Sequence, residues 1–295
     1  MKSGTTSLHR YLESHPQLYL LPEKEVPYFT NEEYRARGWE WYANEFFAQA
    51  PLGKLWGKST PQYMAHPGTG IPQKIRGEMG QVKLIALLRN PVERAYSHYK
   101  MEVKREEEKR TFIKAIDETL QSADSEVDSL KRYVALGEYG RILEDYLQTF
   151  PREQLLVLFA EDLKKEPGAT LKRVLNFLNV DASFVPRNLG RLYHVGGTRR
   201  RIPVDEHDLA KHGLFRKFLK LVPRRSRRFF ERRFLFWFMI WNTSPDSPDQ
   251  QMPLEARERL IEFYREDACR LRGILNQPLP WPELSDVKAK PGFVG

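Results

Sequence analysis

Residues 82–99 read VKLIALLRNPVERAYSHY, and this stretch decides the fold class. Its first seven residues form a nearly continuous apolar run, which is typical of a strand buried on both faces of a parallel sheet. Asn90 then suits the N-cap of a helix, Pro91 suits the first helical position, and Glu93 places negative charge in the first turn. The stretch therefore predicts a buried strand that leads directly into a helix.

Strand and helix patterns also alternate along the rest of the chain. Short extended runs occupy 17–21, 54–58 and 155–159, and helical stripes occupy 8–12, 39–46, 167–178 and 260–275. Alternation of this kind predicts an α/β fold, with a parallel sheet, helices on both of its faces and a helical C-terminal part.

The bulk composition limits the class of protein. With 295 residues and 41% apolar content, the chain can bury a large core. The single cysteine, Cys269, excludes an intramolecular disulfide framework. No run reaches the length of about 18 apolar residues that a transmembrane helix needs. We therefore expect a cytoplasmic protein, which can also lie at the periphery of a membrane.

The positive charge is concentrated in one segment. Residues 199–233 hold thirteen Lys and Arg but only four acidic residues, an excess that equals the whole net charge of +9. We expect one domain over 1–295, with an α/β core at about 1–200, a basic helical part at about 205–276 and an irregular tail at 277–295. The basic segment is either a solvated helix face or a contact for a polyanion.

The chain opens on a loop that can bind an anion. Gly4 lets the backbone approach a ligand, and hydroxyl and amide groups at the start of a helix favour negative charge. The loop consists of Lys2, Ser3, Gly4, Thr5, Thr6 and Ser7. Its lysine precedes the glycine, whereas the Walker pattern places a lysine after the second glycine. A phosphate-like group is the ligand that this loop suits, although a Ser/Thr run before a helix can also be a simple cap.

The loop and the strand-end motif together resemble the family of sulfotransferases that use 3′-phosphoadenosine 5′-phosphosulfate (PAPS). In that family a lysine-first Gly-Thr-Thr loop is combined with a central strand that ends in Arg-Asn/Asp-Pro and a helix that carries a serine. Arg89 and Ser97 match the residues that bind the 3′-phosphate of the donor. A guanidinium group at a strand end can hold a phosphate by two hydrogen bonds, which is the physical reason for an arginine there.

Three further segments are similar to motifs of the same family. Glu25, in Glu-Lys-Glu-Val-Pro-Tyr-Phe, matches the catalytic base of the carbohydrate-type branch, and a glutamate can take a proton from an acceptor. Lys58, in Lys-Ser-Thr-Pro-Gln-Tyr, matches a lysine that faces the acceptor or the transferring group. The loop residues Gly197, Thr198 and Arg199 match contacts to the 3′-phosphate.

The resemblance implies a sulfotransferase that moves a sulfuryl group from PAPS to a hydroxyl or amine, with no metal. The Glu25 motif favours a carbohydrate, and other small hydroxyl compounds stay open as acceptors. Lys2 and Lys58 would stabilise the transferring group. Family members place an apolar strand before the opening loop, whereas this sequence has only Met1 there. The resemblance therefore implies that the first strand is missing. Either the true start lies upstream, which we favour, or the sheet tolerates a gap with exposed apolar edges.

Two other functions remain open from the sequence. A nucleotide kinase or other P-loop phosphotransferase would use ATP and magnesium, but the position of Lys2 argues against it. A basic protein that binds a membrane surface or nucleic acid would act through 224–241, where arginines alternate with aromatic residues. A sulfotransferase could use the same segment for peripheral membrane or polyanion contact, and we expect no specific nucleic acid partner.

Overall fold

The computed structural model describes residues 2–21, 25–64, 68–121, 132–191, 193, 198–200, 243–245 and 251–285. The chain divides into two compact units, one made of 1–193 and 252–295 and the other of 194–251. In the second unit, the described residues form an antiparallel pair of strands, β5 (Thr198–Arg200) and β6 (Thr243–Pro245). The assignment of all 295 residues to one domain stays a prediction.

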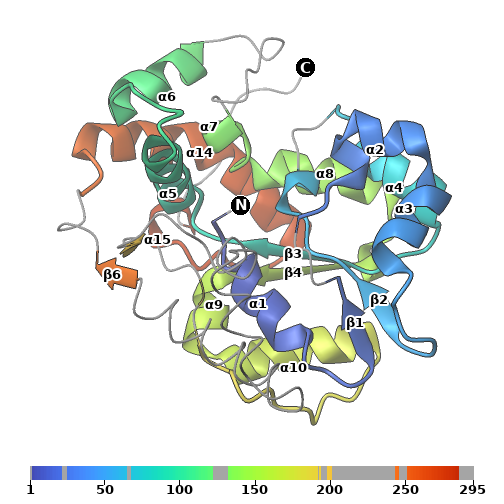
Figure 1. Cartoon of the computed structure of the whole chain (residues 1–295). Helices are drawn as coiled ribbons and strands as arrows, with labels where there is room; N and C mark the ends of the chain where they lie inside the picture. Colours follow the sequence, from blue (N-terminus) through green and yellow to red (C-terminus); the bar gives the residue numbers. More distant parts are fainter. Residues whose placement is uncertain are drawn as a thin grey trace, which may run out of the picture. The chain divides into compact units, whose positions relative to one another are not determined.

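Four strands of the first unit form two parallel pairs (Figure 1). Strand β1 (Leu18–Leu20) pairs with β2 (Leu55–Gly57). Strand β3 (Leu84–Leu88) pairs with β4 (Leu155–Phe159), so that Leu84 faces Leu155 and Leu88 faces Phe159. The parallel pairing confirms the α/β class, and all four strands lie where the sequence patterns placed them.

Helices connect these strands and complete the first unit. They are α1 (Thr5–Leu12), α2 (Glu32–Arg37), α3 (Trp39–Phe47), α4 (Ile71–Met79), α5 (Pro91–Lys104), α6 (Phe112–Gln121), α7 (Arg132–Ala135), α8 (Tyr139–Thr149), α9 (Ala160–Lys165), α10 (Pro167–Leu178), α14 (Leu254–Leu275) and α15 (Pro282–Ser285). Short 3₁₀ turns are η1 (Tyr28–Thr30), η2 (Pro61–Tyr63) and η4 (Arg152–Gln154). None of the helices in the described ranges is long and apolar enough to cross a membrane.

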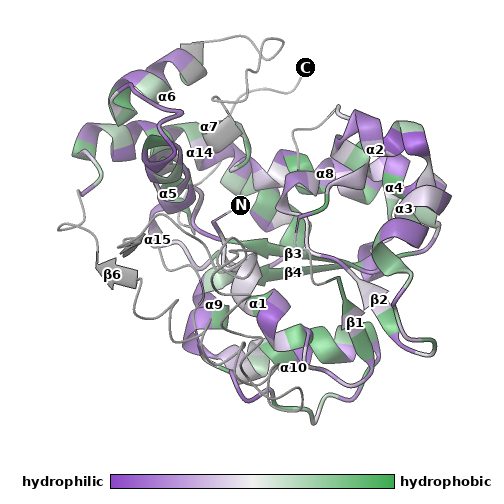
Figure 2. Ribbon diagram, viewed as in Figure 1, coloured by the Kyte–Doolittle hydropathy of each residue, from purple (hydrophilic) through white to green (hydrophobic). Residues whose placement is uncertain are grey.

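Helices cover both faces of the β3–β4 pair, as the sequence predicts. Ala86 and Leu88 of β3 are buried in a core that includes residues of α5, α6, α8 and α14. Leu87, between them, points to the opposite face and is buried in a second core with Leu8 of α1 and Val174 of α10. Side chains alternate across a strand, so a strand with apolar residues on both faces needs a cover on each. Figure 2 shows β3 and β4 as apolar strands among helices of mixed polarity.

The C-terminal part differs in one place from the sequence expectation. The predicted apolar stripe of α14 is buried, with Leu260 and Leu271 both fully enclosed. The tail at 277–295 was expected to be irregular, and this is wrong for its first part because α15 forms there, directly after the buried Trp281, and itself carries the buried Leu284. A four-residue helix is too short to show a period in the sequence. Residues 201–242, which include most of the basic segment 199–233 and all of 224–241, lie outside the described residues.

Candidate active site

The opening loop forms a helix N-terminus with an unusual backbone. Lys2 and Gly4 both have positive φ angles, of 64° and 85°, and Gly4 is the N-cap residue of α1. A left-handed residue directly before a helix favours glycine, since it has no Cβ to clash with the backbone. The first turn of α1 begins at Thr5, and the positive end of the helix dipole lies there. The loop has the chemistry of an anion site.

Arg89 joins this loop to the end of strand β3. Its Nη1 atom donates a hydrogen bond to the carbonyl oxygen of Lys2 at 3.2 Å, across 87 residues of sequence. Tyr139 of α8 donates from its hydroxyl to the carbonyl oxygen of Arg89 at 3.0 Å, and a hydrogen bond also joins the Tyr139 and Ser3 hydroxyls. The loop and the strand end, which the sequence treats separately, thus form one local structure.

Helix α5 carries Ser97 away from the same turn. Asn90 is the N-cap residue of α5, as predicted, and its side-chain oxygen accepts from the backbone N–H groups of Val92 and Glu93 at 3.0 and 3.3 Å. Ser97 lies two turns further along and is 9% exposed. The cap fixes the start of α5, and this determines where Arg89 and Ser97 stand relative to each other.

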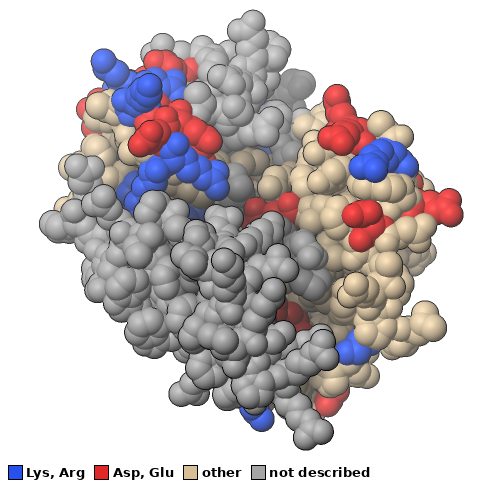
Figure 3. All heavy atoms as spheres, viewed as in Figure 1, with Lys and Arg blue, Asp and Glu red and all other residues tan. Residues whose placement is uncertain are grey.

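Positive charge surrounds the opening loop. Burial lowers the pKa of Lys2 below its ordinary value, and neighbouring cations lower it further. These cations belong to Arg89, Lys104, Arg105 and Lys100. Figure 3 shows Lys and Arg side chains gathered, together with acidic ones, over α5 and α6. A group of cations that lowers the pKa of Lys2 is suited to a ligand that brings several negative charges.

Lys58 forms the centre of a second cluster. Its Nζ atom donates to the hydroxyl of Tyr42 and lies 4.8 Å from the centre of the Tyr42 ring. Burial lowers the pKa of Lys58 to about 7, so the amine changes its charge near neutral pH. Tyr42 is fully buried on α3, and its hydroxyl donates to the carbonyl oxygen of Val26 at 2.8 Å.

The Glu25 segment is tied to the Lys58 segment. The backbone N–H of Glu25 donates to the carbonyl oxygen of Ser59 at 3.2 Å. Tyr42 bridges the residues beside them, because it contacts both Val26 and Lys58. Glu25 itself is exposed and has a positive φ of 68°. The two candidate catalytic side chains thus come from neighbouring segments, although 33 positions separate them in the sequence.

A cavity of about 1010 Å³ lies between one side of α1 and the Lys58 segment, and Lys2, Arg89, Ser97 and Glu25 do not line it. Thr5 of the opening loop and Lys58 both line it, together with the rings of Tyr42 and Tyr63. All four strands of the first unit also contribute to its wall, with Leu20, Leu55, Ile85 and Leu155 among the lining residues. One side of α1 and the Lys58 amine therefore face a shared space that is large enough for a ligand.

The third predicted phosphate contact cannot be placed with the others. Gly197 lies outside the described residues, and Thr198 and Arg199 lie in β5, which belongs to the second unit. Their role as 3′-phosphate contacts stays a prediction, as do the roles of the other site residues. Within the described ranges, no group of three or more His, Cys, Asp or Glu side chains could hold a metal ion.

Sequence reasoning missed two tyrosines that organise the site. Tyr42 belongs to an aromatic helix face that predicts core packing, and Tyr42 is indeed buried in that core. Tyr139 starts α8 and has no local feature that links it to Arg89. In each case the phenol ring packs in a core while its hydroxyl holds a residue of the site, and only the second role needs tertiary structure.

Known proteins resemble the chain in sequence and in fold. Residues 1–193 match a family model described as "Sulfotransferase domain". Mouse heparan sulfate glucosamine 3-O-sulfotransferase 5 is 29% identical over 189 residues, which are 64% of this chain and 54% of that protein. The membrane-associated sulfotransferase kil1 of Dictyostelium discoideum is 45% identical over 101 residues, which are 34% of this chain and 21% of that protein.

A solved structure supports the fold independently. The crystal structure of a sulfotransferase from Alicyclobacillus acidocaldarius aligns with a TM-score of 0.63 at 23% identity, covering 94% of this chain and 92% of that one. The chain spans about half the length, or less, of the two curated relatives. The family model nevertheless covers 193 of the 295 residues, including the opening loop, the Arg89 turn and Lys58. The chain therefore belongs to the sulfotransferase family.

Proposed function

We propose that the protein transfers a sulfuryl group from PAPS to a hydroxyl or amine group of a carbohydrate. One observation carries the proposal: the guanidinium of Arg89 is bonded to the carbonyl of Lys2, which joins the helix N-terminus to the strand-end arginine. A donor with a phosphosulfate at one end and a 3′-phosphate at the other needs two anion sites held at a fixed separation. The residues around this hydrogen bond can supply both.

The donor would lie along the loop and the start of α5. In this proposal the opening loop, from Lys2 to Ser7, binds the 5′-phosphosulfate through its backbone N–H groups and hydroxyls. Arg89 and Ser97 bind the 3′-phosphate, and the family resemblance adds Gly197, Thr198 and Arg199 as further contacts to it. The lowered pKa of Lys2 supports the assignment: burial is its main cause and neighbouring cations add to it, and a bound anion would stabilise the charged amine against both.

The transfer itself would be an in-line displacement at sulfur. Glu25 takes the proton of the acceptor group, the acceptor oxygen or nitrogen forms a bond to sulfur, and the bond from sulfur to the 5′-phosphate oxygen breaks. Adenosine 3′,5′-bisphosphate leaves with that electron pair. Lys2 and Lys58 stabilise the negative charge that grows on the transferring group and on the bridging oxygen. The ammonium groups supply this charge without a metal ion.

The acceptor assignment rests on the relatives and on the Glu25 motif. The names of the mouse protein and of human bifunctional heparan sulfate N-deacetylase/N-sulfotransferase 2 describe transfer to heparan sulfate. Carbohydrate acceptors are therefore the first class to test. A peripheral membrane or polyanion contact through 224–241 is part of the proposal, and the membrane-associated relative from Dictyostelium is consistent with it.

Transfer from ³⁵S-labelled PAPS to glycan, lipid and phenol acceptors tests the function directly. We expect label in a glycan product, and we expect Glu25→Gln to lower kcat by about 10²–10⁴-fold, the usual contribution of a general base. Glu33→Gln, at an exposed position on α2, is the matched control. Nearly full turnover by Glu25→Gln would remove the base assignment. Phosphate transfer from ATP with magnesium, in place of sulfuryl transfer, would favour a kinase.

A further inference from the structure

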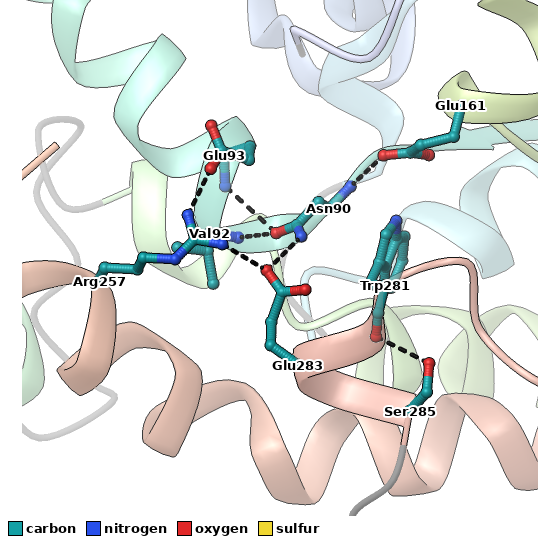
Figure 4. A network of polar contacts seen from close by, with 8 residues as sticks. All are labelled: Asn90, Val92, Glu93, Glu161, Arg257, Trp281, Glu283 and Ser285. Carbon is teal, nitrogen blue, oxygen red and sulfur yellow. Dashed lines mark hydrogen bonds and ion pairs between the residues drawn. The ribbon is translucent and has the colours of Figure 1, made fainter. Parts of the chain in front are cut away.

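A polar network surrounds Asn90 at the turn that follows Arg89 (Figure 4). The backbone N–H of Asn90 donates to Glu161 of α9 at 3.0 Å, and its side-chain Nδ2 donates to Glu283 of α15 at 2.9 Å. Its Oδ1 atom accepts from the first N–H groups of α5. Glu283 can accept only from the amide nitrogen, so it fixes which end of the Asn90 amide faces the helix. The cap of α5 is thereby set from outside the helix.

Arg257 of α14 connects this network to the first turn of α5. Its Nη1 atom donates to Glu93 at 2.6 Å, and its Nη2 atom donates to the same Glu283 oxygen that holds Asn90, at 2.8 Å. Glu93, Glu161 and Glu283 place three carboxylates beside a turn that should bind a phosphate, and such charges repel an anion. Arg257 pairs with two of them, which offsets that repulsion.

Trp281, the residue before α15, is linked to Arg89 through Tyr139. Trp281, 1% exposed, packs with its ring centre 5.5 Å from that of Phe159 and 6.0 Å from that of Tyr139. Tyr139 in turn holds the carbonyl oxygen of Arg89. The segment around α15 thus supports both the residue after Arg89, through Glu283, and the carbonyl of Arg89 itself, through Tyr139.

We propose that Glu283 and Arg257 are positioning residues that set the selectivity of this protein for a 3′-phosphorylated nucleotide. They act through Asn90, whose cap fixes the start of α5 and therefore the relative positions of Arg89 and Ser97. The inference rests on the proposed function, in which Arg89 and Ser97 bind the 3′-phosphate. Both positioning residues lie outside residues 1–193, the part that matches the family model. In this proposal, the selectivity of residues 1–193 for a 3′-phosphorylated nucleotide depends on a C-terminal segment of the chain.

Binding of two nucleotides to the full chain separates positioning from simple stability. Calorimetry would compare adenosine 3′,5′-bisphosphate with AMP, which lacks the 3′-phosphate. The Kd for AMP divided by the Kd for adenosine 3′,5′-bisphosphate measures the selectivity. We expect Glu283→Leu and Arg257→Gln to lower that ratio about tenfold, since each removes a hydrogen bond to a charged group. The Kd for AMP should stay within about twofold, because the opening loop is not touched.

Two further variants act as controls. Glu283→Gln keeps an oxygen that can accept from Asn90, so it should retain most of the selectivity. Arg259→Gln removes another arginine of α14 that bonds two carboxylates, Asp117 and Glu255, away from this network, and it should behave as wild type. If Glu283→Leu does not fold, Arg257→Gln at its half-exposed position gives the same test.

The outcomes distinguish the inference from the proposed function. A wild-type ratio retained in both Glu283→Leu and Arg257→Gln would overturn the inference, and so would an equal loss of affinity for both nucleotides. If the wild-type chain does not prefer adenosine 3′,5′-bisphosphate to AMP, the proposed donor is wrong. In that case the absence of selectivity is measured in the wild-type chain, before any variant is made.

Discussion

Single residues of the site owe their chemistry to burial. Lys58 matches a family motif in sequence, but its amine has a pKa of about 7 only because the protein encloses it beside Tyr42. A lysine with that pKa is charged below neutral pH and largely uncharged above it. Its proposed role is to stabilise negative charge on the transferring group, so its protonated form is the active one.

We therefore expect the kcat/KM of sulfuryl transfer to fall as pH rises through about 7, which reports the free enzyme. Bound PAPS brings negative charge that raises the pKa of Lys58, so the corresponding fall in kcat should lie at higher pH. Lys58→Arg stays charged and should move the fall in kcat/KM to higher pH, whereas Lys109→Arg, at an exposed position, should not. A flat wild-type profile from about pH 6 to 9 would contradict a role for the Lys58 charge.

At the scale of elements, helices α8 and α14 hold the frame around Tyr139. Asp267 of α14 accepts from the backbone N–H groups of Gly140 and Arg141, both at 2.8 Å, and so caps α8 from a distant part of the chain. A Cβ atom on Gly140 would lie 2.6 Å from the carbonyl oxygen of Asp267, so the close approach of the helices requires glycine. Burial raises the pKa of Asp267 to about 6.

Removal of this carboxylate should destabilise the protein. We expect Asp267→Ala to lower the free energy of unfolding at pH 7 by about 1–3 kcal/mol, since two buried N–H groups lose their acceptor. Urea unfolding measures the change, and Glu266→Ala, at the exposed neighbouring position, should have little effect. An Asp267→Ala chain as stable as wild type would contradict this prediction.

The pH dependence of stability gives a second signature of the same group. The pKa of Asp267 is higher in the folded chain, at about 6, than its ordinary value of 3.8, so the folded state binds more protons between these values. The contribution of this group to stability should therefore fall as pH rises from about 4 to 6, with a slope of at most about 1.4 kcal/mol per pH unit. Asp267→Ala should lack that part of the slope.

At the scale of the whole molecule, the site depends on segments from most of the first unit. The opening loop and α8 contact Arg89, α15 contacts Asn90, and α14 contacts Glu93 in the first turn of α5. A ligand at this turn should therefore stabilise the folded chain as a unit, because it binds the assembled site and not the unfolded one.

We expect adenosine 3′,5′-bisphosphate to raise Tm, by an amount equivalent to about 2.7 kcal/mol at a concentration of 100 Kd. The shift should shrink with added salt, since it depends on charge, and EDTA should leave both the shift and the activity unchanged. Differential scanning fluorimetry measures it, with adenosine as the uncharged control. A chain whose activity is lost with EDTA would instead need a metal, and the proposed mechanism would have to change.

Much of this organisation is present in the sequence because it depends on near neighbours. The apolar run before Arg89 and the Asn90-Pro91 start of α5 are local signals, and the structure confirms both. The motif residues Lys2, Lys58 and Arg89 could also be selected by their spacing and context. Patterns of this kind predict local structure without knowledge of the tertiary fold, since a strand or a helix has the same periodicity in any protein.

Only the tertiary structure decided how these residues are held. Tyr42 beside Lys58, Tyr139 on the Arg89 carbonyl and Glu283 on Asn90 are contacts between distant segments, and each depends on how helices pack. The same packing gave Lys58 its low pKa and made a helix of a tail expected to be irregular. The sequence by itself determined the family and the strands, and it predicted candidate residues for the site. Packing determined their charge and position, because burial and long-range hydrogen bonds exist only in the folded chain.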